Sequence, residues 1–129
     1  MAIFGVGTDI VSLERIDRSF QRHGDKFAHR ILSAAELEEY HQRKNKQAYL
    51  AKRFAAKEAI SKALGTGMQK GIDFKQLVIL RSTLGKPEVT LEGAAKAWAH
   101  QHHIDIIHVS ISDERDNALA FAVAEITAP

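Results

Sequence analysis

The helix-forming tendency of this chain is concentrated in Arg53-Phe54-Ala55-Ala56-Lys57-Glu58-Ala59-Ile60-Ser61-Lys62-Ala63-Leu64-Gly65-Thr66-Gly67. With successive residues about 100° apart around a helix, the apolar side chains of this stretch reach almost all the way round. Such a helix is expected to be buried on most sides. Gly65 and Gly67 then suit a C-terminal cap in the left-handed backbone region. The sequence therefore predicts a long central helix around which the rest of the fold packs.

Two charged residues interrupt this apolar helix. Glu58 falls between Phe54 and Ala55 on the helical cylinder, and Lys62 follows one turn later. A carboxylate in apolar surroundings needs a partner. One interpretation is a Glu–Lys pair at i,i+4, which contributes about 0.2 to 0.5 kcal/mol on an exposed helix. The other is a functional site in which both side chains meet a ligand.

A β-strand is predicted from Ile3 to Val11, and its alternation places Gly5, Gly7 and Asp9 on one face. Glycines weaken a strand unless another backbone or a ligand comes close, so two of them on one face indicate a close approach. Asp9 ends this face. It is either a functional carboxylate or an aspartate that accepts backbone N–H groups at a helix entry.

Length and composition restrict the class of protein. The chain has 129 residues, 45% hydrophobic and 26% charged, which fits one globular domain spanning residues 1–129. Its net charge of only +2 disfavours nonspecific nucleic-acid binding. With no cysteine, a disulfide framework or a thiolate metal site is excluded. Since no apolar run reaches about 18 residues, we expect a soluble, cytoplasmic protein that does not enter a membrane.

A second helix is predicted from Ser12, its N-cap, to about Arg22. One face carries the apolar stripe Leu13, Ile16 and Phe20. The opposite face carries Arg15, Arg18 and Arg22, a run of like charges. Such a run is either a solvated face or a surface for an acidic partner.

Two further helices have clear start signals. Ser33 with Glu36 forms a capping box for a short helix that reaches about Gln42. Asn45 is the expected N-cap of the long helix. The loop between them holds a second basic cluster: Arg43, Lys44 and Lys46. The segment from Lys26 to Ile31 gives no clear pattern.

The second half of the chain is predicted to form a β-hairpin, an alanine-rich helix and two more strands. The expected ranges are 74–82 and 88–91 for the hairpin, 93–103 for the helix, and 104–112 and 118–126 for the strands. One face of the last strand is made only of alanines, which permits close packing of a helix or of another subunit: Ala118, Ala120, Ala122 and Ala124. The whole pattern indicates an α+β domain with an antiparallel sheet.

Asp9 and Glu58 are the candidate metal ligands. Magnesium is usually held by one or two carboxylates, several waters and substrate phosphates, and Lys62 and Ser61 lie beside Glu58 on the helix. An anion at the C-terminal end of a helix meets the negative end of the dipole, so cations or a metal must hold it there. The seven histidines are loosely spaced and are interpreted as surface residues, not as a zinc site.

Two motifs resemble the signatures of the 4'-phosphopantetheinyl transferases, in their small holo-acyl-carrier-protein synthase branch. They are Gly5-Val6-Gly7-Thr8-Asp9-Ile10 and the stretch from Arg53 to Gly67. The similarity extends over nearly the whole chain. It implies a compact α+β domain, with an antiparallel sheet packed on the long helix, that assembles as a homotrimer with coenzyme A in clefts between subunits.

The resemblance also implies a reaction: transfer of 4'-phosphopantetheine from coenzyme A to a serine of apo acyl carrier protein in fatty acid biosynthesis. Asp9 and Glu58 would ligate Mg²⁺ at the diphosphate. Lys62 would neutralise phosphate charge, and Glu58, or a water held by the metal, would accept the serine proton. The coenzyme A contacts would be Arg53, Ser61, Lys62 and the Gly65, Thr66 and Gly67 backbone, with Gly85, Lys86 and Pro87 near the adenosine.

The basic residues Arg15, Arg18, Arg22 and Arg43 would bind the acidic carrier protein. The chain departs from the pattern at one place, because many relatives carry histidine where this sequence has Asp113. Any role that the histidine has in those relatives is therefore not expected of Asp113. The rival hypothesis is a noncatalytic binding domain that uses its basic face to dock acidic protein or nucleic acid, and it does not predict magnesium-dependent binding of coenzyme A.

Overall fold

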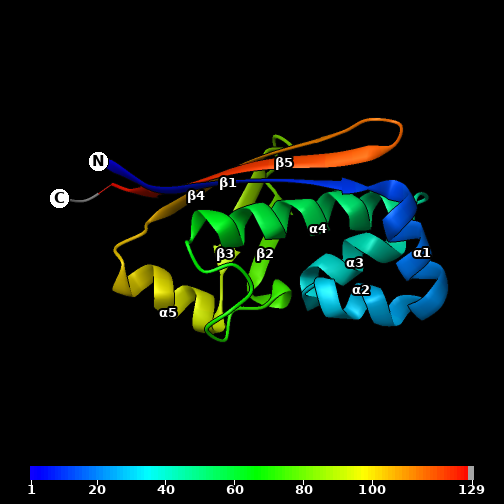
Figure 1. Cartoon of the computed structure of the whole chain (residues 1–129), viewed down its shortest axis with the longest axis horizontal. Coiled ribbons are helices and arrows are strands. Elements are labelled where there is room, and N and C mark those ends of the chain that lie inside the picture. Colours follow the sequence, from blue (N-terminus) through cyan, green and yellow to red (C-terminus); the bar gives the residue numbers. More distant parts are fainter. Residues whose placement is uncertain (128–129) are drawn as a thin grey trace.

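The computed structural model describes residues 1–127 and shows an α+β fold in which a long helix, α4, lies beneath a three-stranded antiparallel sheet (Figure 1). Helices α1, α2 and α3 gather at one end of α4, and α5 lies toward the other end. The elements follow in this order: β1 Ala2–Ser12, α1 Leu13–His23, α2 Asp25–Ile31, α3 Ala34–Gln42, α4 Lys46–Ala63, β2 Leu77–Arg81, β3 Pro87–Leu91, α5 Gly93–Gln101, β4 Ile106–Asp113 and β5 Asn117–Ile126.

The central helix forms as predicted. The Asn45 side chain accepts a hydrogen bond from the Ala48 amide and caps its N-terminus. Leu50, Ile60 and most of its alanines are fully buried, which is what an apolar pattern on nearly every side requires. The helix is therefore the core element against which the other layers pack.

The sheet approaches α4 closely because β1 and β5 present small residues to it. A Cβ atom added to Gly5 would lie 2.2 Å from the Ala63 carbonyl oxygen, and one added to Gly7 would lie 2.0 Å from the Ala59 carbonyl oxygen. The close approach predicted from these glycines is therefore to helix backbone. The alanine face of β5 is also fully buried, within the same chain: Ala118, Ala120, Ala122 and Ala124.

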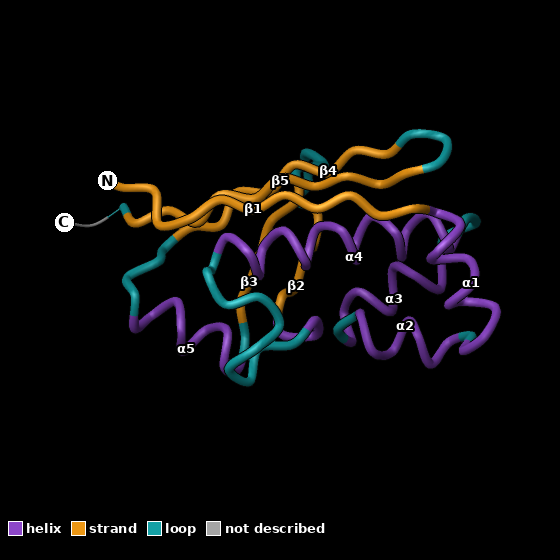
Figure 2. The backbone as a smooth tube through the Cα atoms, viewed as in Figure 1, coloured by secondary structure: helices purple, strands orange, loops and turns teal. Residues whose placement is uncertain are grey.

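The strands form two sheets, not the single sheet that was predicted. The larger has the order β1-β5-β4, and β2 and β3 make a separate hairpin (Figure 2). Strand β2 also begins at Leu77, because Phe74–Gln76 forms a 3₁₀ turn capped by the Asp73 side chain, which accepts from the Lys75 amide. A local cap that competes with the strand explains the later start.

Helix α2, which the sequence pattern did not reveal, covers the segment left unassigned. It has only seven residues, too few for a helical period to stand out. Gly24, with φ +56°, separates it from α1 and lets the chain reverse. Among the helices of residues 1–127, none is both long and apolar enough to cross a membrane.

Candidate active site

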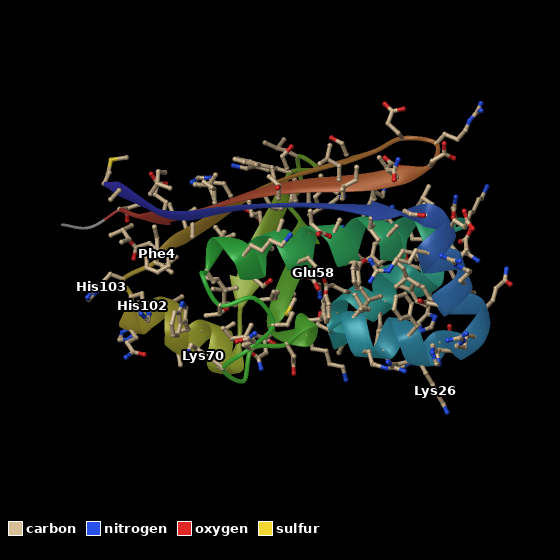
Figure 3. All side chains as sticks on the ribbon, viewed as in Figure 1. Phe4, Lys26, Glu58, Lys70, His102 and His103 are labelled. Carbon is tan, nitrogen blue, oxygen red and sulfur yellow. The ribbon has the colours of Figure 1, made fainter. Side chains whose placement is uncertain are left out.

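Three of the predicted residues meet where β1 runs beside the last turns of α4. Asp9 comes from the strand, and Glu58 and Lys62 come from successive turns of the helix (Figure 3 labels Glu58). Lys62 Nζ donates to the Thr8 carbonyl oxygen at 2.9 Å and lies 3.4 Å from Asp9 Oδ1. The structure thus brings together residues 53 positions apart in the sequence.

The carboxyl group of Glu58 has a perturbed pKa. Burial raises the pKa of its carboxyl above the ordinary value, and the negative charge of Asp9 raises it further, while Lys62 and Arg15 act in the opposite direction. A carboxylate that is costly to ionise beside a second carboxylate favours a cation between the two. A raised pKa also makes Glu58 a stronger base than an ordinary glutamate.

Glu58 is not the partner of Lys62 in a simple helix pair. Among residues 1–127, the Glu58 carboxylate accepts no hydrogen bond and forms no ion pair within 4.0 Å, whereas Lys62 pairs with Asp9. The alternative of an i,i+4 salt bridge is therefore wrong in this structure. The Glu58 side chain is left to interact with something outside the chain.

The donor set fits magnesium. No group of three or more histidine, aspartate or glutamate side chains within the described residues is placed to hold a metal, so an all-protein cage of the zinc or calcium kind does not form there. Two hard carboxylates with Lys62 beside them match an ion that keeps several waters and takes further ligands from a substrate phosphate. Asp9 and Glu58 would hold it.

The glycine-rich end of α4 forms a tight turn. Gly65 and Gly67 have φ values of +84° and +61°, and the Ser61 carbonyl oxygen accepts from both the Thr66 and Gly67 amides. The Ser61 hydroxyl donates to the Glu58 carbonyl oxygen, and the Thr66 hydroxyl donates to that of Gly67. Both hydroxyl groups are buried and shape the turn, which leaves the exposed backbone at Gly65 for a ligand.

Arg53 does not lie at this site. Its side chain is 1% exposed, with the guanidinium 3.6 Å from Glu36 and 3.3 Å from Glu39, and it stacks on the Tyr49 ring. An arginine so enclosed has no free face for a coenzyme. Its place in the fold argues for a structural role instead of the predicted coenzyme contact.

The sequence did not predict a buried ionic cluster that lies beside Arg53. Lys57 and Glu36 are both fully buried, and Lys57 Nζ donates to Glu36 Oε1 at 2.6 Å and to the carbonyl oxygens of Ile31 and Phe74. Burial lowers the pKa of Lys57, and the Glu36 carboxylate opposes that shift. The capping-box signal located Glu36 but gave no sign of its partner, 21 positions away.

The three arginines of α1 share one exposed face, as predicted, and line one hollow. Arg15 also lies over the Phe54 ring at 5.9 Å, and Phe54 stacks on Phe74. The two phenylalanine rings line an adjacent apolar hollow of about 480 Å³ that also includes Phe27 and Arg30. The arginine face therefore continues into an apolar depression that ends one helical turn from Glu58.

The other predicted contact residues lie apart from the carboxylate pair. Arg43 is exposed, follows the C-terminal end of α3 and stacks on the Tyr49 ring of α4, so it is not part of the arginine face of α1. The predicted adenosine contacts, Gly85 to Pro87, form the turn of the β2–β3 hairpin, where Gly85 has φ +85°. Lys86 and Pro87 also line a groove of about 730 Å³ between β3, α5 and β4. Asp113 is exposed at the end of β4.

The fold and the carboxylate pair define a class of enzyme. A family model described as the 4'-phosphopantetheinyl transferase superfamily matches residues 5–124. The chain belongs to this superfamily, and its closely placed acids fit the family's group-transfer chemistry.

The similar proteins and structures described next are holo-[acyl-carrier-protein] synthases. A Vibrio cholerae holo-[acyl-carrier-protein] synthase is 50% identical over 123 residues, which is 95% of this chain and 98% of the relative. A crystal structure of the Neisseria meningitidis synthase has a TM-score of 0.91 at 48% identity, covering 96% of this chain and 99% of that one. The Helicobacter pylori synthase in complex with coenzyme A has a TM-score of 0.81 at 35% identity, covering 93% and 99%.

Proposed function

We propose that this protein is a holo-[acyl-carrier-protein] synthase that transfers 4'-phosphopantetheine from coenzyme A to a serine of apo acyl carrier protein. The observation that carries the proposal is the Asp9–Glu58 pair, in which Glu58 has a raised pKa and its carboxylate has no hydrogen-bond or ion-pair partner among residues 1–127. Full-length similarity to synthases, one of them solved with coenzyme A, supports it. The product would serve fatty acid biosynthesis in the cytoplasm.

The bonds change as follows. The serine Oγ attacks the phosphorus that bears the pantetheine group, a new Oγ–P bond forms, and the bond from that phosphorus to the bridging oxygen of the diphosphate breaks. Adenosine 3',5'-bisphosphate leaves with that oxygen. Glu58 accepts the serine proton. Magnesium, held by Asp9 and Glu58, would supply charge neutralisation at the diphosphate.

Lys62 neutralises charge that develops on the leaving phosphate. Its ammonium already lies 2.9 Å from the Thr8 carbonyl oxygen, which fixes the side chain across the site before substrate arrives. The Gly65, Thr66 and Gly67 backbone supplies a surface that a diphosphate can approach without meeting a side chain. The turn of Gly85, Lys86 and Pro87 contacts the adenosine end.

The carrier protein docks on the α1 face. Its acidic surface meets Arg15, Arg18 and Arg22, with Arg43 as a further basic contact, and an apolar side chain enters the hollow beside Phe54. This arrangement delivers the serine toward Glu58, because Arg15 touches Phe54 and its charge acts on Glu58. The docking surface for the carrier protein and the catalytic Glu58 are therefore adjacent.

Three copies assemble through the outer face of the larger sheet. Several large apolar side chains are exposed there, an unusual concentration for a free surface: Val6 56%, Ile10 64%, Leu119 47% and Phe121 45%. A threefold arrangement would bring a neighbour's residues to each carboxylate pair. Sedimentation equilibrium should give a trimer for the wild type and a monomer for Phe121→Lys, and a monomeric wild type would contradict this assembly.

The transfer reaction is tested by mass spectrometry of apo carrier protein incubated with coenzyme A. We expect a mass gain of one phosphopantetheine group with Mg²⁺ and none after chelation. Asp9→Asn and Glu58→Gln should each lower the rate at least about a hundredfold. Near wild-type turnover by either folded variant would remove the assignment, and Glu38→Gln, an exposed position on α3, serves as a matched control.

A further inference from the structure

The end of α4 is held by a residue from another helix. Trp98 of α5 donates its indole Nε1–H to the Leu64 carbonyl oxygen at 2.9 Å. Leu64 is the C-cap of α4 and directly precedes the Gly65 turn. A C-terminal carbonyl without an intrahelical partner needs a donor from elsewhere, and Trp98 supplies it from 34 positions along the chain.

Trp98 is itself fixed by aromatic neighbours. The His102 ring lies 4.0 Å from the Trp98 ring, between centroids, and His102 Nδ1 is 2.9 Å from the Trp98 carbonyl oxygen. Phe4 of β1 meets His102 edge-on at 5.6 Å, and a Cβ atom on Gly65 would lie 3.8 Å from the Phe4 ring. Phe4 and His102 lie together near α5, away from Glu58 (Figure 3).

This cluster has a consequence for a bound anion. The C-terminal end of α4 is the negative end of its dipole, so an exposed Leu64 carbonyl beside the glycine turn would repel a phosphate. The indole N–H covers that oxygen and ties the turn to α5. No catalytic side chain takes part in the cluster.

We infer that Trp98 is a positioning residue for the anionic donor substrate, acting through Leu64 and the Gly65–Gly67 turn. The inference rests on the proposed function for the identity of that substrate. Loss of the indole N–H should weaken coenzyme A binding and leave carrier-protein docking unchanged, because α1 and α5 lie toward opposite ends of α4 (Figure 1). A purely structural role would reduce the folded fraction without separating the two substrates.

The decisive change deletes one hydrogen-bond donor. Trp98 is the only tryptophan of the chain, so replacing tryptophan with benzothienylalanine, in which sulfur takes the place of the N–H, alters this position alone. Trp98→Phe makes the same deletion with a smaller ring. Gln101→Ala, an exposed change on the same helix, is the matched control.

We expect the KM for coenzyme A to rise about three- to tenfold in both Trp98 proteins, with the KM for carrier protein within twofold of wild type. Amide exchange at Thr66 and Gly67 should accelerate by a similar factor, and Gln101→Ala should change neither. Unchanged exchange and an unchanged KM for coenzyme A in the benzothienylalanine protein would overturn the inference. If the wild type fails to bind coenzyme A, the proposed function fails, and the exchange rates still decide whether Trp98 holds the turn.

Discussion

Lys57 and Glu58 are neighbours on one helix, yet their side chains have opposite surroundings. Lys57 points into the interior, where its three N–H groups meet Glu36 Oε1 and two carbonyl oxygens. Glu58 is under the electrostatic influence of Asp9, and its carboxylate accepts no hydrogen bond from residues 1–127. The difference shows how one helix separates its tasks: charges whose partners are all internal hold the fold, and charges left without internal partners are free for a ligand.

The buried cluster joins several parts of the fold at one place. Glu36 Oε2 accepts from the Ile79 amide of β2, and Oε1 accepts from Ser33 and Lys57. Through these contacts α3, β2 and the 3₁₀ turn are tied to α4. Breaking one partner of such a buried pair leaves the other charged and unpaired, which is strongly destabilising.

The largest effect is therefore expected from Lys57→Met. Removal of the ammonium leaves the buried Glu36 carboxylate with only the more distant Arg53 guanidinium, at 3.6 Å, as a cation, and should cost about 3 to 5 kcal/mol of unfolding free energy. In thermal denaturation the midpoint should fall by more than about 10 °C. The protein that remains folded should keep coenzyme A turnover within about threefold of wild type. Wild-type stability in this variant would contradict the role given to the cluster.

Reversing charge on the arginine face should have a smaller effect, confined to one substrate. In the variant with both Arg15→Glu and Arg22→Glu, we expect the KM for carrier protein to rise about tenfold at low salt, because electrostatic steering is lost. The KM for coenzyme A should be unaltered, and the difference from wild type should shrink as salt increases. An unchanged KM for carrier protein would show that this face is only solvated.

The smallest predicted effect concerns stability at the Glu58 site. The folded pKa of Glu58 is raised above its unfolded value, so ionised Glu58 costs stability, and this cost appears as pH rises through the folded pKa. Glu58→Gln should therefore melt about 1 to 3 °C higher than wild type at neutral pH. The two proteins should melt together at pH values below the unfolded pKa. A variant less stable than wild type at neutral pH would contradict the raised pKa.

The sequence predicted the features that local rules control. Asn45 as a cap, the Ser33–Glu36 capping box and the apolar surface of α4 all depend on residues within a turn or two of each other, and the structure confirms them. The structure also confirms that Gly5 and Gly7 share a close-approach face, because period-2 alternation fixes which side chains share a face.

Contacts between segments far apart in the sequence are harder to predict from the sequence. Nothing in the spacing of Glu36 and Lys57 indicates that they form a buried pair, and the motif position that suggests a coenzyme A contact for Arg53 gives no sign of its burial. The division into two sheets depends on which strands pair, since β3 pairs with β2 and β4 pairs with β5, and alternation within one strand does not reveal this. For Asp9 and Glu58, the resemblance to a family supplied the pairing that the spacing left open.

The most direct test of the contrast between the two clusters compares Glu58→Gln with Glu36→Gln in the same assays. Each variant removes one negative charge: Glu58→Gln removes it from α4 itself, and Glu36→Gln removes it from the α3 residue that pairs with Lys57 of α4. Transfer of phosphopantetheine to apo carrier protein and the thermal midpoint are measured on each. We predict that Glu58→Gln loses at least about a hundredfold in rate with no loss of stability, whereas Glu36→Gln loses several degrees of stability and keeps most of its rate when folded. The opposite pattern, or equal losses of rate in both folded variants, would contradict the division of the helix into a structural side and a chemical side.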